Sequence, residues 1–396
     1  MRKLLTSNFS PLILAAAATA AFAQENQTTN PTYQQDKAGM TTKTRVIKTA
    51  NGAYIDNIPP LKWEGRNGGT GCTYSGAVAT ILNAIGKNAT YEQVAGLAGS
   101  CYHLGMCYGW NYGSSLINTS YHHQKIDCDW NALRAFGIDY YTLGEQDKEA
   151  YGEHARKSID AGFPVLLLGL NNPPEWCILT GYEKDGAEFK YFGRTYCDPD
   201  DIPENELYTG NRYVLGKNFP GEHPQGFFRL LDRPCEPTPP KDALKISLQT
   251  CLDMFKPNNE VKFGCDAYAF MIESFNKNEY PDSFSKENAS KEVIRFMLDL
   301  LLDERRAAHI HLSQSADLLS GENKTKLATA AGLFKEMHDT LYSVIPRDKQ
   351  RKEEYALTPE FRKELADALR KMSALEKQAR DIVADILNNW ETENIK

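Results

Sequence analysis

Cysteine pairs of the form C-x-x-C are absent from this sequence, although it holds nine cysteines. Their absence excludes a zinc ribbon and a thioredoxin-type redox motif. Beyond the first residues, no stretch reaches the roughly 18 consecutive apolar residues that indicate a membrane helix. Basic charge is not in excess either: the formal net charge is −7, which argues against nucleic acid as a partner. The sequence contains no internal repeat, and no cofactor or metal motif is predicted.

The first residues have the pattern of a secretory signal peptide. Arg2 and Lys3 precede an apolar run over residues 12–22, and an A-x-A pattern ends at Ala23. The run is too short to remain as a membrane span. No cysteine follows the cleavage site, so a lipoprotein anchor is not expected. We predict a signal peptide over residues 1–23, and export to the periplasm or to the outside of the cell.

The composition changes twice along the rest of the chain. Residues 24–50 are polar and are predicted to be a disordered linker. Residues 51–233 show helical patterns first and strand patterns afterwards, an order typical of the α+β class. Four prolines between residues 234 and 240 mark a boundary, and helical spacing of apolar residues dominates residues 241–396. We predict an α+β domain followed by an all-α domain, and expect proteolysis near Pro237 to leave two folded pieces.

The cysteines become informative if the protein enters an oxidising compartment. Their odd number leaves at least one of them without a partner in the chain. Cys101 and Cys107 flank a short loop that contains a glycine. From the sequence, these two residues either close a small bridge or remain free.

The stretch GGTGCTYSGAVATILNAIG, residues 68–86, has the pattern of a glycine-rich loop that leads into a helix. Apolar residues recur at i, i+3, i+4 and i+7 over residues 78–85, and Gly86 suits the left-handed position that ends a helix. A capping-box pattern at residues 90–93 predicts a second helix. Cys72 is therefore expected at the N-terminus of the first helix.

A cysteine at a helix N-terminus has an electrostatic setting that favours its nucleophilic form. Free backbone N–H groups and the helix macrodipole stabilise a thiolate. The glycines near Cys72 let the backbone approach a ligand closely, and Gly71 and Asn67 are candidate oxyanion-hole donors. We expect Cys72 to have a lowered pKa and an exposed sulfur. The alternative is that Cys72 is a buried small residue or a disulfide partner.

A second motif, GFPVLLLGLNNPPEWCILTGYEKDGAEFKYFGRTY, spans residues 162–196. It holds a buried strand and then two strand-like runs joined by Asp185-Gly186, a pair that favours a tight turn. Together with the helix-leading Cys72, this order resembles the papain-like fold of the bacteriocin leader peptidases. More closely, residues 54–232 resemble the butirosin-biosynthesis acyltransferase N-terminal domain family. The resemblance implies a Cys nucleophile, a His base at the start of the second strand, and a third group, usually Asp, at the end of the next strand.

The chain departs from this pattern at the residues on which catalysis depends. Glu175 stands where the resemblance implies the histidine, and Asp198 lies slightly beyond the position of the implied aspartate. The peptidases also place a glutamine several residues before the cysteine, where this chain has Arg66 and Asn67. The reference pKa of Glu is about 4.3, so near neutral pH it is a weak base unless burial raises that pKa. A carboxylate next to the thiol would also oppose thiolate formation.

Three functions fit this sequence. The first is an exported papain-like enzyme in which Cys72 attacks an acyl or peptide carbonyl, with Glu175 and Asp198 as the other candidate catalytic residues. The second is a catalytically inactive binding protein that keeps the papain-like cleft. The third is that the helical region is the active part and assembles with a partner. In the first two, the ligand is a peptide or an acyl-bearing small molecule in a cleft near Cys72.

Other polar and aromatic residues are weaker candidates. Three histidines lie in a loop region that can cover a cleft, but each is more typical of a surface histidine or of a loop histidine with its hydrogen bonds satisfied: His103, His122 and His123. Three acids could hold a cation but are more typical of a solvated turn: Asp198, Asp200 and Asp201. His309 and His311 stand two apart on a predicted helix, so a shared metal is not expected. Four aromatic residues either line a groove or pack within their loop: Tyr108, Trp110, Tyr112 and Tyr121.

Overall fold

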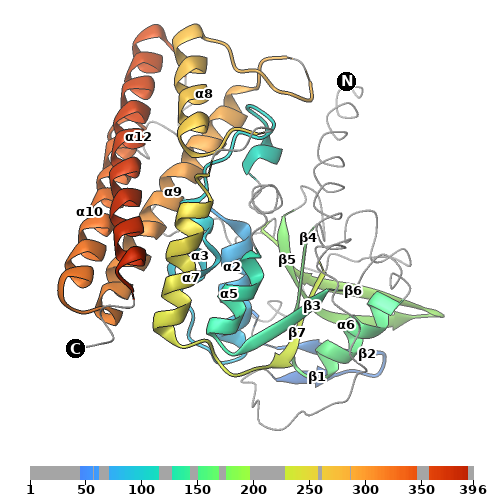
Figure 1. The fold of residues 1–396 in the computed structure, drawn as a ribbon. Helices are drawn as coiled ribbons and strands as arrows, with labels where there is room; N and C mark the ends of the chain where they lie inside the picture. The colour runs from blue at the N-terminus through green and yellow to red at the C-terminus, as the bar shows by residue number, and fades with distance from the viewer. Residues whose placement is uncertain are drawn as a thin grey trace, which may run out of the picture.

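The computed structural model describes most of the chain between Arg45 and Trp390. The described residues are 45–56, 58–61, 71–115, 127–142, 150–168, 175–196, 228–256, 261–285, 287–345 and 356–390. The predicted signal peptide, most of the predicted linker, Asn67 and Asp198 lie outside them. Within the described part the fold is α+β, as predicted: an antiparallel sheet with helices comes first, and a helical region follows (Figure 1).

Seven strands of the described residues form one antiparallel sheet in the order β1-β2-β5-β4-β7-β3, with β6 also paired to β5. They are β1 (Val46–Lys48), β2 (Gly52–Ile55), β3 (Ile138–Thr142), β4 (Val165–Leu168), β5 (Trp176–Asp185), β6 (Glu188–Arg194) and β7 (Phe228–Pro234). The turn between β5 and β6 holds Gly186 at a φ of 65°, as the Asp-Gly pair predicts. β1 lies inside the stretch predicted as linker, so regular structure is present before residue 50.

The helices of the first part pack on this sheet and on one another. They are α2 (Thr73–Ala84), α3 (Tyr91–Ala98), α5 (Cys128–Ala135) and α6 (Tyr151–Asp160). α2 packs against β5, and it ends just before Gly86, whose φ of 86° is left-handed, as predicted. The predicted capping box is also present, because the Thr90 side chain accepts the Gln93 N–H and the Gln93 side chain accepts the Thr90 N–H.

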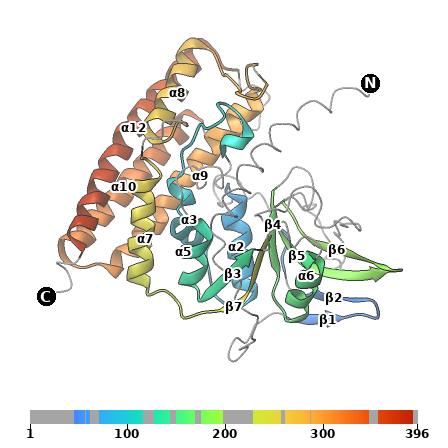
Figure 2. The ribbon, with the colours of Figure 1, turned by 45° about the vertical axis from the view of Figure 1, so that its right-hand side comes forward.

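The helical region consists of long helices that pack side by side in both ribbon views (Figures 1 and 2). They are α7 (Pro240–Asp253), α8 (Gly264–Lys277), α9 (Lys291–Ser315), α10 (Gly321–Val344) and α12 (Pro359–Asn388). α10 packs against α9 and α12, and α12 also contacts α7 and α8. Among the residues that the structure describes, no helix is both long and apolar enough to span a membrane.

The two parts of the chain share one hydrophobic core. A single cluster of buried apolar side chains extends from Ala53 in β2 to Trp390 just beyond α12. α9 packs against α3 and the short 3-10 helix η2 (Ser100–Tyr102), and α7 packs against α3 and α5. Figure 2 shows α3 and α5 between the sheet and α7. The proline-rich stretch therefore connects two parts that remain in broad contact.

The loop that follows η2 joins this core. Trp110 is fully buried, its indole N–H donates to the Ser274 hydroxyl at 2.9 Å, and its ring packs edge-on against Phe275. Trp110 therefore packs against α8 in the core and is not exposed to line a groove. No disulfide joins Cys101 to Cys107, so the small bridge that the sequence left open is not formed in this structure.

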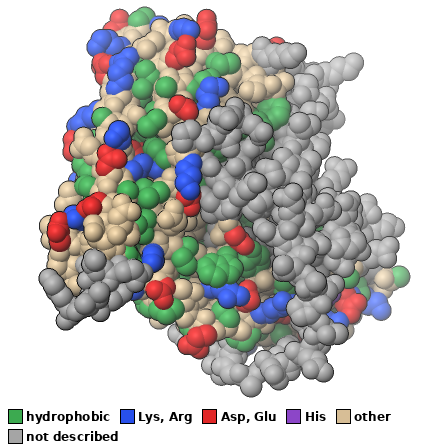
Figure 3. All heavy atoms as spheres, viewed as in Figure 1, with side chains coloured by type: hydrophobic (Ala, Val, Ile, Leu, Met, Phe, Trp, Pro, Cys, Tyr) green, Lys and Arg blue, Asp and Glu red, His purple; other side chains and the backbone are tan. Residues whose placement is uncertain are grey.

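The surface of the helical region carries charges of both signs. Figure 3 shows acidic and basic side chains interspersed over these helices. On the described residues of this face, no continuous basic area is visible, which fits the formal charge of −7.

Candidate functional site

Cys72 occupies the N-cap position of α2, where the sequence predicts it. Its side chain is only 8% exposed, and this burial raises the pKa of the thiol to about 11. The Ser75 hydroxyl donates to the sulfur at 3.6 Å and favours the thiolate, whereas the charge of Glu304 disfavours it. The expectation of an exposed sulfur with a lowered pKa is wrong, because desolvation outweighs the helix N-terminus.

The two backbone N–H groups ahead of α2 already have partners. The Cys72 N–H donates to the Tyr91 hydroxyl oxygen at 3.0 Å, and the Gly71 N–H donates to Oδ2 of Asp303 at 3.0 Å. The Tyr91 hydroxyl donates in turn to the same Asp303 oxygen at 2.6 Å. A carboxylate and a phenol therefore occupy the donors that an oxyanion would use. Gly71 is not a free oxyanion-hole donor, contrary to expectation.

The close approach of the Asp303 carboxylate to the backbone ahead of α2 requires a glycine at position 71. A Cβ at that position would lie 2.8 Å from Oδ2 of Asp303, too close for any larger residue without a shift. Asp303 itself belongs to α9, and its side chain is almost fully buried. Arg306 fixes its other oxygen through two N–H groups, at 3.2 and 3.0 Å, and also pairs with Glu92 at 2.8 Å. This buried carboxylate is thus held by charge-assisted hydrogen bonds.

Glu175 lies beside the start of α2. The Thr73 hydroxyl donates to Oε2 of Glu175 at 2.9 Å, and the Tyr196 hydroxyl donates to the Thr73 carbonyl at 3.1 Å. Burial raises the pKa of the Glu175 carboxyl to about 7, and the hydrogen bond from Thr73 lowers it only in part. A carboxyl with that pKa exchanges protons near neutral pH, which the reference value for Glu would not allow.

A buried histidine–carboxylate pair lies behind the α2 site. His103 Nδ1 and Oε1 of Glu304 are 3.2 Å apart, and both side chains are buried. Burial raises the pKa of Glu304, and His103 opposes that shift. His103 is thus a buried loop histidine with a hydrogen-bond partner, one of the two ordinary roles expected for it. His122 and His123 lie outside the described residues.

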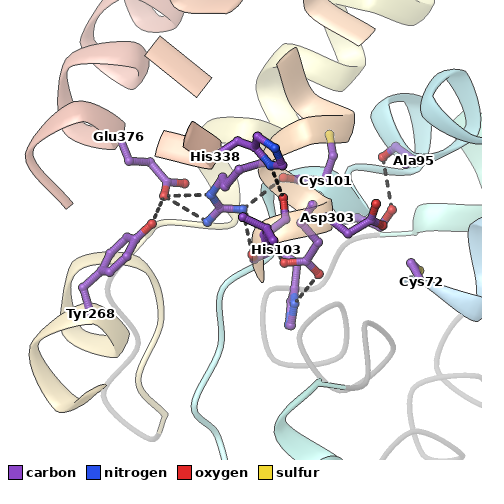
Figure 4. A network of polar contacts seen from close by, with 12 residues as sticks. Cys72, Ala95, Cys101, His103, Tyr268, Asp303, His338 and Glu376 are labelled. Carbon is purple, nitrogen blue, oxygen red and sulfur yellow. Dashed lines mark hydrogen bonds and ion pairs between the residues drawn. The ribbon is translucent and has the colours of Figure 1, made fainter. Parts of the chain in front are cut away.

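Arg305, the next residue of α9, connects this loop to the other long helices. It is fully buried and donates to the carbonyls of Cys101 and His103 and, at 2.9 Å, to Glu376 of α12. The Tyr268 hydroxyl of α8 donates to the same Glu376 oxygen at 2.7 Å. Figure 4 shows Glu376 and Tyr268 on one side of the view and Asp303 and Cys72 on the other, with no drawn contact that reaches Cys72.

The two neighbouring histidines of α9 contact different helices. His311 is buried and meets the Ser247 hydroxyl of α7 at 3.2 Å, and burial lowers its pKa to about 4. His309 contacts the Ala331 carbonyl of α10 at 3.0 Å. They do not converge on one site. Within the described ranges, no group of three or more His, Cys, Asp or Glu side chains is placed to hold a metal ion.

Sequence reasoning identified Cys72 and Glu175 but missed the carboxylates of α9. Asp303 and Glu304 belong to the run Asp-Glu-Arg-Arg at residues 303–306, and such a run in a helical pattern is ordinarily solvent-exposed. The only sequence feature that could have indicated these buried carboxylates is that four successive charged residues interrupt a helix otherwise rich in Leu and Ala. No protein-family model matches the chain, and no curated protein matches it in sequence.

Proposed function

We propose that this protein is an exported, papain-like binding protein in which the cysteine site does not perform catalysis. The observation that carries this proposal is the occupation of the two N–H groups ahead of α2. Asp303 and Tyr91 accept these donors, so a developing oxyanion would have to displace a buried carboxylate that Arg306 also holds. The proposed ligand class is a peptide or an acyl-bearing small molecule that binds near Cys72.

Two further features support the loss of cysteine catalysis. The pKa of Cys72 is about 11, so the thiol is almost entirely protonated at neutral pH. Glu175 stands at the position where the papain-like pattern has its histidine base, and the charge of Glu304 disfavours ionisation of the thiol. The papain-like assignment itself is supported by the helix-leading cysteine and by the β5–β6 hairpin that follows β4.

A cysteine-dependent acyltransferase or hydrolase is the second candidate, and the pKa of Glu175 favours it. At about 7, this carboxyl can accept the thiol proton as the Cys72 sulfur attacks an acyl carbonyl. The sulfur–carbonyl bond then forms, and the leaving group departs with the proton from Glu175. Water or an amine next attacks the thioester and releases Cys72 as a thiol. Export, predicted from the N-terminal residues, applies to both candidates.

Acylation of the full chain distinguishes the two candidates. The protein is incubated with an acyl thioester of N-acetylcysteamine and with p-nitrophenyl acetate, and Cys72 is examined by peptide mass spectrometry. Parallel alkylation by iodoacetamide at pH 8 measures thiol reactivity, with the exposed Cys265 as internal reference. A thiol with a pKa of about 11 is ionised on the order of 100-fold less at that pH than an ordinary cysteine.

For a binding protein, we expect no acyl group on Cys72 and much slower alkylation of Cys72 than of Cys265. Two variants serve as controls. Asp303→Asn keeps the shape of the Asp303 side chain but removes its charge, and Cys72→Ser removes the sulfur. An acyl adduct on Cys72 that disappears in Cys72→Ser and weakens in Glu175→Gln would establish the enzyme instead.

A further inference from the structure

A cavity far along the chain from Cys72 lies where α8 ends and α9 and α12 begin. It has a volume of about 400 Å³, within the size range of small-molecule sites. Its polar lining includes Asn278, Tyr280, Asn288, Lys291 and Thr358. Its apolar lining includes Ala289, Ile294 and Leu357. Among the described residues that line it, none is acidic.

Helix ends and a lysine make this cavity electropositive. Thr358 is the N-cap of α12, and Lys291 is the first residue of α9, so the positive ends of two helix macrodipoles meet there. Each of these helices has an acid in its first turn, Glu292 and Glu360, but neither acid lines the cavity. The C-terminal end of α8 at Asn278 contributes a partial charge of the opposite sign. The ammonium group of Lys291 has no ion-pair partner in the part of the chain that the structure describes. Lys291 and the two helix N-termini together outweigh the C-terminal end of α8, so the cavity favours an anionic ligand.

Two buried polar groups, one lining this cavity and one beside it, lack the hydrogen-bond partners that a folded protein normally gives them. Tyr280 lines the cavity, is 5% exposed, and its hydroxyl has no hydrogen-bond partner. Arg362, in the first turns of α12, is not among the residues that line the cavity, but it acts electrostatically on Tyr280, and its buried Nε also has no partner. An unpaired buried donor costs about 1–3 kcal/mol, so both groups are ready to bind an acceptor.

We propose that this cavity binds a small organic oxyanion, a carboxylate or a phosphate ester with a compact apolar body. Lys291 and Arg362 would neutralise the anionic head, and the Tyr280 hydroxyl would donate to it. The apolar body would rest against Ile294 and Leu357. The site is separate from Cys72 and does not depend on the function proposed for that residue.

Three probes of similar shape test the charge requirement: benzoate, phenyl phosphate and the uncharged benzamide. Binding to the full chain is measured by isothermal titration calorimetry at concentrations up to about 10 mM. We expect benzoate or phenyl phosphate to bind and benzamide to bind at least 10-fold more weakly. Preference for benzoate identifies a carboxylate head, and preference for phenyl phosphate identifies a phosphate head. Failure of both anions to bind, or equal binding of benzamide, overturns the proposal.

Variants then assign the binding to this cavity. Lys291→Gln and Arg362→Gln should each weaken anion binding by about 10-fold, as expected for loss of a charge-assisted contact. Tyr280→Phe should weaken binding without lowering the melting temperature, because it removes a hydroxyl that the free protein leaves unpaired. Lys335→Gln, which changes an exposed lysine of α10, is the matched control. Binding that is unchanged in all three cavity variants would place the anion elsewhere and refute this site.

Discussion

Burial decides the chemistry of individual residues around α2. Desolvation is the first cause of the raised pKa of Cys72, about 11, and of the raised pKa of Glu175, about 7. In both cases the charged form is the one that burial disfavours. A neutral thiol therefore lies near a carboxyl that titrates in the physiological range. The sequence draws attention to the helix N-terminus at Cys72, but this N-terminus affects the pKa of the thiol less than desolvation does.

Glu175 should make the stability of the protein depend on pH. Its folded-state pKa lies above its ordinary value, so between about pH 4.5 and pH 7 the folded protein binds more protons than the unfolded chain. The free energy of unfolding therefore falls as pH rises through this window. We expect a loss of about 2 kcal/mol relative to Glu175→Gln, allowing for the partial exposure of the side chain. Urea unfolding of both proteins from pH 4.5 to pH 8 measures it.

An exposed glutamate provides the control for this measurement. The pKa of Glu153 on α6 is lowered by Lys157, so Glu153→Gln should not reproduce the pH-dependent difference. If the stability difference between the wild-type protein and Glu175→Gln were the same at pH 4.5 and pH 8, the carboxyl would not be desolvated.

Between elements, the contact of α3 with α9 depends on a single glycine. A Cβ at Gly96 would lie 2.0 Å from Cγ of His311, which is buried and bound to Ser247. Gly96→Ala should therefore force the helices apart or displace His311. We expect a destabilisation of about 1–3 kcal/mol, the usual cost of overpacking a core. Thermal and urea unfolding measure it.

The control for this change is another helical glycine. No atom lies within 4 Å of a Cβ built on Gly332 of α10. Gly332→Ala should stabilise the protein by about 0.5–1 kcal/mol, because alanine has the higher helix propensity. If Gly96→Ala were equally stabilising, the close contact with His311 would have no energetic consequence.

Helix ends, helix caps and turns could be predicted from the sequence where the residues that determine them are neighbours in the chain. The left-handed Gly86, the capping box at residues 90–93 and the Asp185-Gly186 turn each depend on neighbours in the chain, and all three are present. The faces of the long helices were not predictable in this way. Periodicity marks α9 as a helix, but it does not reveal that residues 303–306 face the first part of the chain.

The site was predictable only in part for the same reason. The resemblance placed Glu175 near Cys72, and the Thr73 hydrogen bond agrees with that position. Asp303 lies 232 residues from Gly71, and no local pattern links the two. The glycines that precede Cys72 in the sequence also give no information on whether its side chain is buried. The sequence therefore identified the candidate nucleophile, whereas the groups that control it come from a distant helix.

The molecule as a whole is held together across its proline-rich link. α9 supplies Asp303 to the loop before α2, and its neighbour Arg305 ties the chain at Cys101 to Glu376 of α12. Removal of one partner from a buried ion pair costs about 3–5 kcal/mol, because the other charge remains unpaired. The hydrophobic core also continues from one part to the other. This structure argues against two pieces that fold and separate independently.

A cut in the link tests that conclusion. With a specific protease site inserted after Thr238, between β7 and α7, cleavage should leave the two fragments associated, and they should elute as one species in size-exclusion chromatography. The shared core and the buried contacts of Asp303 and Arg305 would hold them together without a peptide bond. Arg305→Met in the same cleavable protein should promote dissociation, since Glu376 loses one of its partners. Exposed Lys335→Met should leave the fragments associated. Fragments that separate in buffer without denaturant, each with its own cooperative unfolding transition, would show instead that the two parts are independent domains joined by a linker.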